Sequence, residues 1–249
     1  MTMKTSNIIW QDIEFFLTRL KNLPVSKSLT LDEKNGCFCV STGCSFESWV
    51  YYPARVTDPE MVKNVMKFFD DEKISFMWPV YNGGERILEE CGLVFAGNLT
   101  AMSYTPPQNL NPESNLRVYE TDSVAWAQTA WHGFGGEAFD TPMNYYNLVE
   151  ALFNDKDNLK LYLTECEGEN VGTFLTTLEK DLMGVYYFAT IPEYRRQGVA
   201  RVMMNEICKL AYGKTIVLQA TPAGLPFYKK FGFEELFLIP IYSTESDIF

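Results

Sequence analysis

Residues 187–201 read Tyr187-Phe188-Ala189-Thr190-Ile191-Pro192-Glu193-Tyr194-Arg195-Arg196-Gln197-Gly198-Val199-Ala200-Arg201. The start of this stretch predicts the end of a strand, and the helical spacing after Gly198 predicts a helix. The basic, Gly-containing segment between them predicts a loop. The first amides of a helix lack intrahelical acceptors and carry partial positive charge. A loop without bulky side chains at Gly198 and Ala200 can therefore wrap its amides around a diphosphate.

The loop is positively charged, whereas the chain as a whole is negatively charged. With 21 basic and 32 acidic residues, the chain has a net charge of -11. The adjacent Arg195 and Arg196 reverse that sign locally, which favours a phosphate ligand. The alternative is a solvated helix start with glycine as a hinge, because short Gly-containing loops are weak signals alone. The net charge opposes binding to nucleic acid or anionic membranes, and we expect neither as a partner.

The pattern around this loop predicts an α+β fold. Apolar and β-branched runs predict strands at 116–120, 160–164, 171–177, 183–190, 215–220 and 237–242. Helical spacing predicts helices at 123–131, 143–153, 198–212 and 222–231. The turn-like residues 167–170 make 160–177 a hairpin. We expect a mixed, mostly antiparallel sheet flanked by helices, with one strand-helix-strand crossover.

Two motifs in this half resemble the GCN5-related N-acetyltransferase (GNAT) family. Arg195-x-x-Gly198-x-Ala200 after a strand is similar to the family's acetyl-CoA signature, Arg/Gln-x-x-Gly-x-Gly/Ala. Residues 228–233, Tyr-Lys-Lys-Phe-Gly-Phe, look like its Tyr-x-x-x-Gly-Phe end. The resemblance covers about residues 116–249. It departs at Thr221-Pro222, where many relatives have Asn, which leaves the contacts of that turn open.

The resemblance implies acetyl-CoA as co-substrate and no metal. In the family, the strand before the loop splays from its neighbour, and its backbone binds the pantetheine arm and polarises the thioester. The residues implied to bind the cofactor are Phe188, Ala189, Thr190, Arg195, Arg196, Gln197, Gly198, Val199, Ala200 and Arg201. Tyr228 is implied as the catalytic proton donor, since a phenol near pKa ~10 can stabilise a thiolate near ~8.5. The alternative makes Tyr228 one aromatic of an amphipathic helix.

The acceptor side is less defined. Candidates for a general base are Glu120, Glu137, Asp140, Glu165 and His132, and a chain of water molecules could replace them all. Residues 131–140 mix glycines with aromatic and acidic side chains, so Trp131 and Glu137 are candidate substrate-binding residues. An ordinary surface loop explains the same stretch equally well. If the loop binds the acceptor, Glu137 and Asp140 favour a cationic amine.

The first half resembles a decayed copy of the second. A shift of 140 residues places 58–80 over 198–220 without a gap, and 87–93 then matches the last helix and its Gly-containing end. Asp58 stands at the position of Gly198, Glu60 at that of Ala200 and Leu88 at that of Tyr228. Carboxylates repel a phosphate, so this copy is expected to bind no CoA. The alternative is chance alignment of two amphipathic α/β units.

The polar stretch 105–115 is the predicted linker, which predicts two domains. These are a degenerate GNAT-like domain at 1–110, structural or on the acceptor side, and a catalytic domain at 116–249. One short run carries Trp49, Tyr51 and Tyr52, and another carries Phe76 and Trp78. Alternation places part of these aromatic residues on opposite sheet faces, which predicts that this domain covers the second. Two related units packed in one chain make a monomer plausible.

The remaining residues restrict the chemistry. Cys37, Cys39 and Cys44 lack the paired spacing of zinc ligands, and Cys37 to Val40 alternates like a strand, so reduced structural thiols are expected. His132 is the only histidine. No apolar run approaches 18 residues and no signal peptide is evident, which predicts a cytoplasmic protein.

The sequence therefore predicts an acetyl-CoA-dependent N-acetyltransferase that acts on a primary amine of a small molecule or peptide. Two enzymatic alternatives keep the same site, namely transfer of another acyl group and transfer to an oxygen acceptor. An alternative of another class is a CoA-binding or sensory module without turnover.

Overall fold

The computed structural model describes residues 3–45, 47–107, 116–121 and 123–246. Contacts divide the chain into two compact units. The first contains residues 1–102, 219–230 and 235–249, and the second contains residues 103–218 and 231–234. Residues 108–115 of the predicted linker lie outside the described residues.

The first unit is an α/β unit with a short three-stranded sheet. Its elements are α1 (Met3–Asn22), β1 (Lys27–Asp32), β2 (Cys37–Ser41), β3 (Trp49–Tyr51), α2 (Pro59–Glu72), β4 (Trp78–Pro79), α3 (Glu85–Glu90), β5 (Val94–Tyr104), α7 (Leu225–Phe231) and β11 (Glu234–Ser243). The order β1-β2-β3 is antiparallel throughout. The 140-residue shift places residues 74–80 over the predicted strand at 215–220, but they are mostly irregular, since only β4 is formed there. A parallel bridge joins Trp49 to Met77.

The apolar residues of the first unit are buried inside it. Residues of β2, β3, α2 and β4 share one core, in which Phe69 stacks on Phe76 with ring centroids 4.2 Å apart and Trp78 has no exposed surface. Neither Phe76 nor Trp78 therefore needs the second unit to cover it, and the expectation of an apolar excess is wrong for these two residues. Periodicity showed which residues are apolar, but it could not show that both lie in one core.

The last strand of the chain belongs to this core. β11 pairs antiparallel with β4, with Tyr242 opposite Trp78, and Val80 N–H donates to Pro240 O at 2.8 Å. Tyr242 also donates a hydrogen bond to Glu89 Oε1 at 2.8 Å. The compact units therefore differ from the predicted boundaries of 1–110 and 116–249, because the edge of β4 is satisfied by residues far along the chain.

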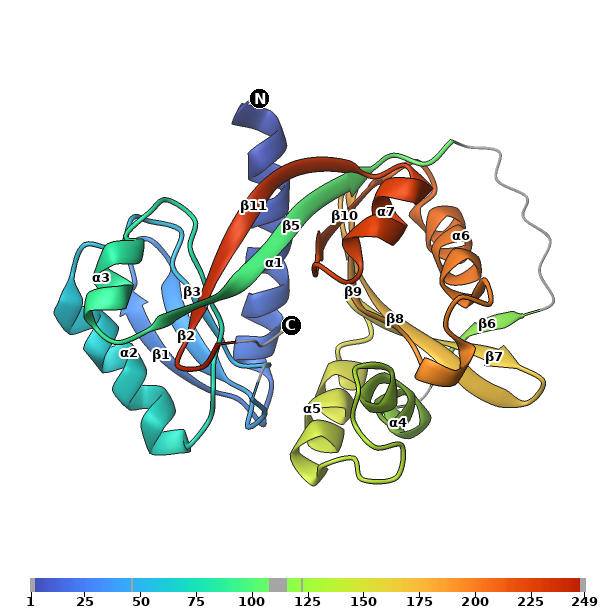
Figure 1. The fold of residues 1–249 in the computed structure, drawn as a ribbon, viewed down its shortest axis with the longest axis horizontal. Coiled ribbons are helices and arrows are strands. Elements are labelled where there is room, and N and C mark those ends of the chain that lie inside the picture. Colours follow the sequence, from blue (N-terminus) through green and yellow to red (C-terminus); the bar gives the residue numbers. More distant parts are fainter. Residues whose placement is uncertain (1–2, 46, 108–115, 122, 247–249) are drawn as a thin grey trace. The chain divides into compact units, whose positions relative to one another are not determined.

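The second unit has helices on both faces of its sheet (Figure 1). Its elements are β6 (Arg117–Glu120), α4 (Ser123–Gly133), α5 (Met143–Asn154), β7 (Leu159–Cys166), β8 (Glu169–Glu179), β9 (Leu182–Thr190), η1 (Pro192–Tyr194), α6 (Val199–Ala211) and β10 (Thr215–Ala220). The strand order is β10-β9-β8-β7-β6. Helices α4 and α5 cover one face and α6 the other.

The predicted elements of the second half are all present. β6 to β9 are antiparallel neighbours, and β10 runs parallel to β9 after the crossover through α6. Glu167 and Gly168 form the two-residue turn of the predicted hairpin, with φ of 52° and 89°. The mixed, mostly antiparallel sheet flanked by helices is therefore confirmed.

The two halves run through the same order of elements. The order strand-strand-strand-helix-strand-helix-strand occurs from β1 to β5 and again from β7 to β11. Asp58, opposite Gly198 in the alignment, precedes α2 and accepts a hydrogen bond from the amide of Glu60 at 2.9 Å. In the first half, therefore, the Asp58 carboxylate accepts a hydrogen bond from an amide at the start of α2. The matching position at the start of α6 is a glycine, which has no side chain to do this.

We predict that Asp58 stabilises the first unit as a helix cap. Replacing it with alanine removes the acceptor of the Glu60 amide, and the free energy of unfolding should fall by about 1 kcal/mol. Asp58→Asn keeps the acceptor without the charge and is the matched control. Chemical denaturation measures both variants. Equal stability of Asp58→Ala and wild type would contradict the capping role.

Candidate active site

Strand β9 contains a bulge in the middle of the site. Leu175 faces Tyr186 and Thr173 faces Ala189, so Tyr187 and Phe188 together oppose one residue of β8. Tyr187 has a φ of 51°, which is rare for an aromatic residue. Thr173 holds this conformation, because its hydroxyl donates to Tyr187 O at 3.0 Å. Such bulges redirect a strand and often lie beside functional sites.

β9 also separates from its parallel neighbour near the bulge. Within the second unit, the β9–β10 register pairs Leu182, Met183 and Gly184 with residues 215–217. β9 then continues for six residues, to Thr190. The backbone that the resemblance assigns to the pantetheine arm, at Phe188, Ala189 and Thr190, lies beyond this paired segment.

The loop after β9 presents a row of amides. Arg196 and Gly198 have φ of 64° and 90°, and Gly198 is the N-cap of α6. The first amides of α6 with a backbone acceptor belong to Arg201 and Val202, which both donate to Gly198 O. Among the described residues, no hydrogen-bond acceptor is paired with the amides of residues 196–200. A Cβ at Gly198 would meet no atom within 4 Å, so the space beside this residue is open.

Two side chains of the loop are directed at the protein. The Arg195 guanidinium donates to Thr190 O at 3.1 Å through Nε and to Gly133 O at 2.9 Å through one terminal nitrogen. Gln197 donates to Glu193 O at 2.7 Å. The neighbouring Arg196 is exposed. Of the two arginines predicted as countercharge, Arg195 therefore also braces the loop.

His132 connects the end of α4 to the same loop. Its Nε2 lies 3.0 Å from Glu193 Oε2, and its Nδ1 lies 3.1 Å from Gly136 O. The Gly136 carbonyl and, next, the Glu193 carboxylate raise the pKa of His132. Because both ring nitrogens face acceptor oxygens, neither presents a lone pair to a substrate. This geometry disfavours His132 as general base.

The predicted acceptor loop forms a compact turn after α4. Trp131 packs against Gly136, where an added Cβ would lie 2.1 Å from the indole nitrogen. Gly136 N–H donates to Trp131 O at 3.0 Å. Beyond this turn, Glu137 and Asp140 are exposed, and Phe139 is fully exposed. The loop thus presents carboxylates and an aromatic ring to solvent together.

Two other base candidates lie at the opposite edge of the sheet. Glu120 on β6 pairs with Lys160 on β7 at 3.1 Å, and Glu165 lies 4.0 Å from Arg117. Both pairs join β6 to β7, and β8 lies between them and β9. The structure therefore gives these carboxylates a role in strand pairing and does not bring them to the loop.

Tyr228 lies on α7 and is 7% exposed. Burial raises its pKa well above the ordinary value of a phenol. The close approach of Gly224 fixes the ring, since a Cβ there would lie 3.1 Å from Tyr228 Cε2. The phenol is thus neutral at physiological pH, in the protonation state that a hydrogen-bond donor needs.

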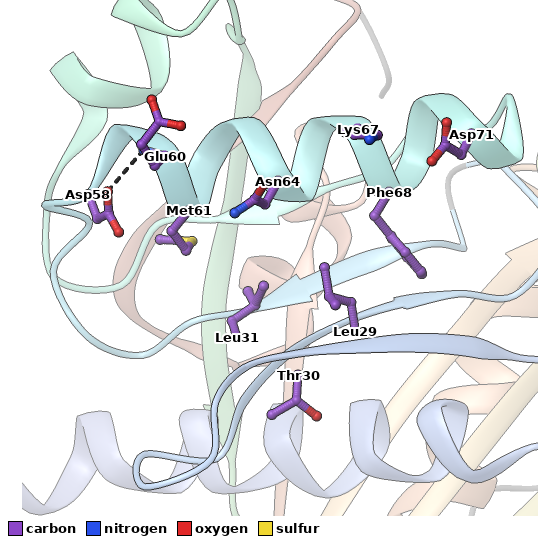
Figure 2. A pocket seen from close by; sticks show the side chains of 10 residues that line it. All are labelled: Leu29, Thr30, Leu31, Asp58, Glu60, Met61, Asn64, Lys67, Phe68 and Asp71. Carbon is purple, nitrogen blue, oxygen red and sulfur yellow. Dashed lines mark hydrogen bonds between the residues drawn. The ribbon is translucent and has the colours of Figure 1, made fainter.

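The start of α2, which the alignment places opposite the start of α6, borders an apolar groove with acidic side chains at its edge. A cavity of about 510 Å³ lies between β1 and α2. Figure 2 shows Leu29 and Leu31 of β1 directed toward Met61 and Phe68 of α2. The charged residues that line it are Asp58, Glu60, Lys67 and Asp71. Three carboxylates against one ammonium disfavour a phosphate here.

The cysteines are thiols in this structure. Cys37 and Cys39 lie on the predicted strand, now β2, and with Cys44 they are buried. Burial raises the pKa of Cys39 and of Cys44 to about 12. Within the described part of the chain, no three His, Cys, Asp or Glu side chains are grouped as metal ligands would be. No helix of that part is both long and apolar enough to cross a membrane.

Two features of the site were not predicted. The alternation of apolar and polar residues along β9 does not predict the bulge at Tyr187. The bulge is visible only as a register shift between β9 and β8. The contact of His132 with Glu193 joins residues 61 positions apart, and only the fold brings them together. The only sequence signal for this contact was the pair of glycines at 133 and 136, because a glycine allows other parts of the chain to approach its backbone closely.

Comparison with known proteins agrees with this geometry. Residues 157–235 match the family model described as acetyltransferase (GNAT) domain. The match includes β9, the loop at 195–201 and the motif around Tyr228. No curated protein matches the chain in sequence.

Three solved structures show the fold. A GCN5-related N-acetyltransferase from Kribbella flavida has a TM-score of 0.65 and 16% identity, with 95% of each chain covered. A GCN5-related N-acetyltransferase-like protein from Streptococcus suis has a TM-score of 0.56 and 12% identity, over 94% of this chain and 98% of that one. A GCN5-related N-acetyltransferase from Sphaerobacter thermophilus has a TM-score of 0.54 and 15% identity, over 76% and 68%. The chain thus has a GNAT-like fold, and its residues 157–235 carry the pattern of a GNAT acetyltransferase domain.

Proposed function

We propose that the protein transfers an acetyl group from acetyl-CoA to a primary amine of a small molecule or peptide. The observation that carries the proposal is the row of amides at residues 196–200, which lack acceptors among the described residues. They lie at the N-terminus of α6, directly after the strand that separates from its neighbour. Helix N-termini of this kind bind phosphate groups.

In this proposal the cofactor runs along β9 and ends at α6. The amides of the loop and the exposed Arg196 hold the diphosphate, while Val199, Ala200 and Arg201 form the first turn beneath it. The polar backbone at Phe188, Ala189 and Thr190 binds the pantetheine arm and polarises the thioester carbonyl. The register of β9 supports this assignment, because on its β10 side the strand continues to Thr190, beyond the paired segment that ends at Gly184.

The transfer needs a free amine and a stable leaving group. The amine nitrogen attacks the thioester carbon, the carbon–sulfur bond breaks, and CoA leaves as a thiolate or thiol. Tyr228 is the proposed donor to the leaving sulfur. Because burial raises its pKa, Tyr228 acts by donating a hydrogen bond to the thiolate, and complete proton transfer from it is unfavourable.

The acceptor is proposed to be cationic and partly apolar. Glu137 and Asp140 supply negative charge on the loop after α4, and Phe139 supplies an exposed ring beside them. A protonated amine is attracted to such carboxylates, and an aromatic ring also favours a cation. The amine must then lose its proton before attack. With both nitrogens of His132 engaged, a water chain or an exposed carboxylate is the proposed base.

The first unit is proposed to be a degenerate GNAT-like domain without its own cofactor. The repeated order of elements supports a shared origin of the two halves. Two observations support the proposal that this unit binds no CoA. The carboxylate of Asp58 already caps the amide of Glu60, and the neighbouring groove has an acidic border. Leu88 replaces the phenol and is fully buried.

The first test of this function changes the charge at the N-terminus of α6. Gly198→Asp places a carboxylate among the loop amides, so the affinity for acetyl-CoA should fall about hundredfold or more. Gly198→Asn is the matched control, because it has the same shape and the same positive-φ strain without the charge. Calorimetry measures both. Similar affinities of the two variants would remove the diphosphate from this loop.

The second test concerns Tyr228. Tyr228→Phe removes the phenolic hydroxyl, and kcat should fall about tenfold to a thousandfold while the affinity for acetyl-CoA stays close to that of wild type. Tyr212→Phe is the control, since Tyr212 is exposed. Release of free thiol from acetyl-CoA reports the rate. A wild-type kcat in Tyr228→Phe would exclude this residue from the mechanism.

The third test separates an enzyme from a binding module. Acetyl-CoA is incubated with the protein and a panel of amines, and thiol release is followed with mass spectrometry of the products. We expect release that depends on a cationic amine and an N-acetylated product. Tight binding of acetyl-CoA with no release for any amine would favour a sensory module, and an ester product would show an oxygen acceptor.

A further inference from the structure

We propose that His132 and Arg195 are positioning residues that join the acceptor loop to the cofactor loop, and that His132 does so only as an imidazolium ion. The proposal rests on the proposed function, because it assigns CoA to the loop after β9. It adds two residues that act through the loop, and it predicts a pH dependence of CoA binding.

The two contacts start from one place, the C-terminal end of α4. Gly133 O accepts from Arg195, and His132, the preceding residue, contacts Glu193. Arg195 and Glu193 flank Tyr194 in the segment between β9 and α6. The end of α4 thus holds this segment at two points, just before the amides of residues 196–200.

The backbone at this point is closely packed. A Cβ on Gly133 would lie 2.8 Å from the Cβ of Ala189, so α4 lies directly against β9. Arg195 spans this junction, since it donates both to Gly133 O on α4 and to Thr190 O at the end of β9. A lysine could supply the same charge to a phosphate, but its single ammonium lacks the planar fork that reaches two carbonyls.

The protonation state of His132 follows from its partners. A backbone carbonyl only accepts hydrogen bonds, and so does an ionised carboxylate. With Gly136 O at 3.1 Å from Nδ1 and Glu193 Oε2 at 3.0 Å from Nε2, both nitrogens must carry protons for both bonds to form. A neutral ring can donate only one of them.

The surrounding charges favour the imidazolium. The groups acting on His132 are the Gly136 carbonyl, the Glu193 carboxylate and the carboxylate of Glu137, and together they raise its pKa. The hydrogen bond from its own backbone amide, the hydrogen bond from His132 and the nearby cation Arg195 lower the pKa of the Glu193 carboxyl. The contact is therefore complete below about pH 6.5, the ordinary pKa of histidine, and is lost as pH rises through the raised value.

The same residues also shape the acceptor loop. Gly136 O, the second partner of His132, lies in the turn that packs against Trp131. One imidazolium thus contacts the acceptor loop through Nδ1 and the cofactor loop through Nε2. After deprotonation the ring can donate only one of these two hydrogen bonds, so it no longer joins the two loops, and Arg195 remains as the brace of the cofactor loop.

The experiment measures CoA binding to the full chain by calorimetry from pH 5.5 to 7.5. His132→Gln places an amide near the position of Nε2, so it can donate to Glu193 without titrating. The phosphates of CoA titrate in both proteins, so the ratio of the two affinities isolates the histidine. We expect wild type to weaken relative to His132→Gln by about twofold to fivefold across this range, as for a partly exposed ion pair.

The arginine is tested by charge-preserving variants at neutral pH. Arg195→Lys should lower the affinity for CoA about tenfold, because the two bonds to carbonyls are lost. Arg117→Lys is the matched control and should leave the affinity unchanged, because Arg117 lies on β6, away from the cofactor loop. Equal effects of the two variants, or an affinity ratio of wild type to His132→Gln that does not change with pH, would overturn the proposal.

Hydrogen exchange separates this proposal from the proposed function. Without ligand, the amides of residues 190–201 should exchange faster in Arg195→Lys than in wild type. At pH 7.5 the same amides should exchange faster in wild type than in His132→Gln. If wild type binds no CoA, the proposed function fails, and exchange still decides whether the two contacts hold the loop. Unchanged exchange in both variants would refute the positioning roles.

Discussion

A backbone amide must find an acceptor, and the second unit leaves several without one at a single place. The β10 side of β9 is paired only as far as Gly184, whereas on the β8 side the pairing is interrupted at Tyr187 and resumes at Ala189. After the turn at η1, the amides of residues 196–200 lack acceptors among the described residues. Unpaired amides are tolerated where water or a ligand completes them. The geometry of the site depends on this constraint.

The fold maintains this arrangement from three sides. Thr173 fixes the positive φ of Tyr187, Arg195 ties the loop to α4, and Gly198 supplies the left-handed conformation that starts α6. Each contact is individually modest. Together they keep polar backbone exposed that would otherwise extend the sheet. The first unit has the same order of elements but differs at the start of the corresponding helix, α2. There the Asp58 carboxylate accepts a hydrogen bond from the amide of Glu60.

Much of this could be predicted from the sequence, and the reasons are local. Periodicity located every element of the second half, and Glu167-Gly168 specified its hairpin, because these patterns depend on neighbours in sequence. The bulge at Tyr187, the pair of His132 with Glu193 and the pairing of β11 with β4 depend on residues distant in sequence. Arg195 was predicted as countercharge from its type, and only the structure showed the two carbonyls that it contacts. Alternation at Phe76 and Trp78 likewise could not reveal that one core buries both.

The central claim is that the amides after β9 bind the diphosphate of CoA, and amide chemical shifts test it most directly. The full chain is labelled with nitrogen-15 and titrated with CoA, and each backbone resonance is followed. The account predicts that the largest shifts occur at residues 188–201, with those of Gly198 and Val199 among them, and that residues 58–61 at the start of α2 do not change. Shifts centred on α2, or saturating binding that leaves residues 196–200 unchanged, would contradict it.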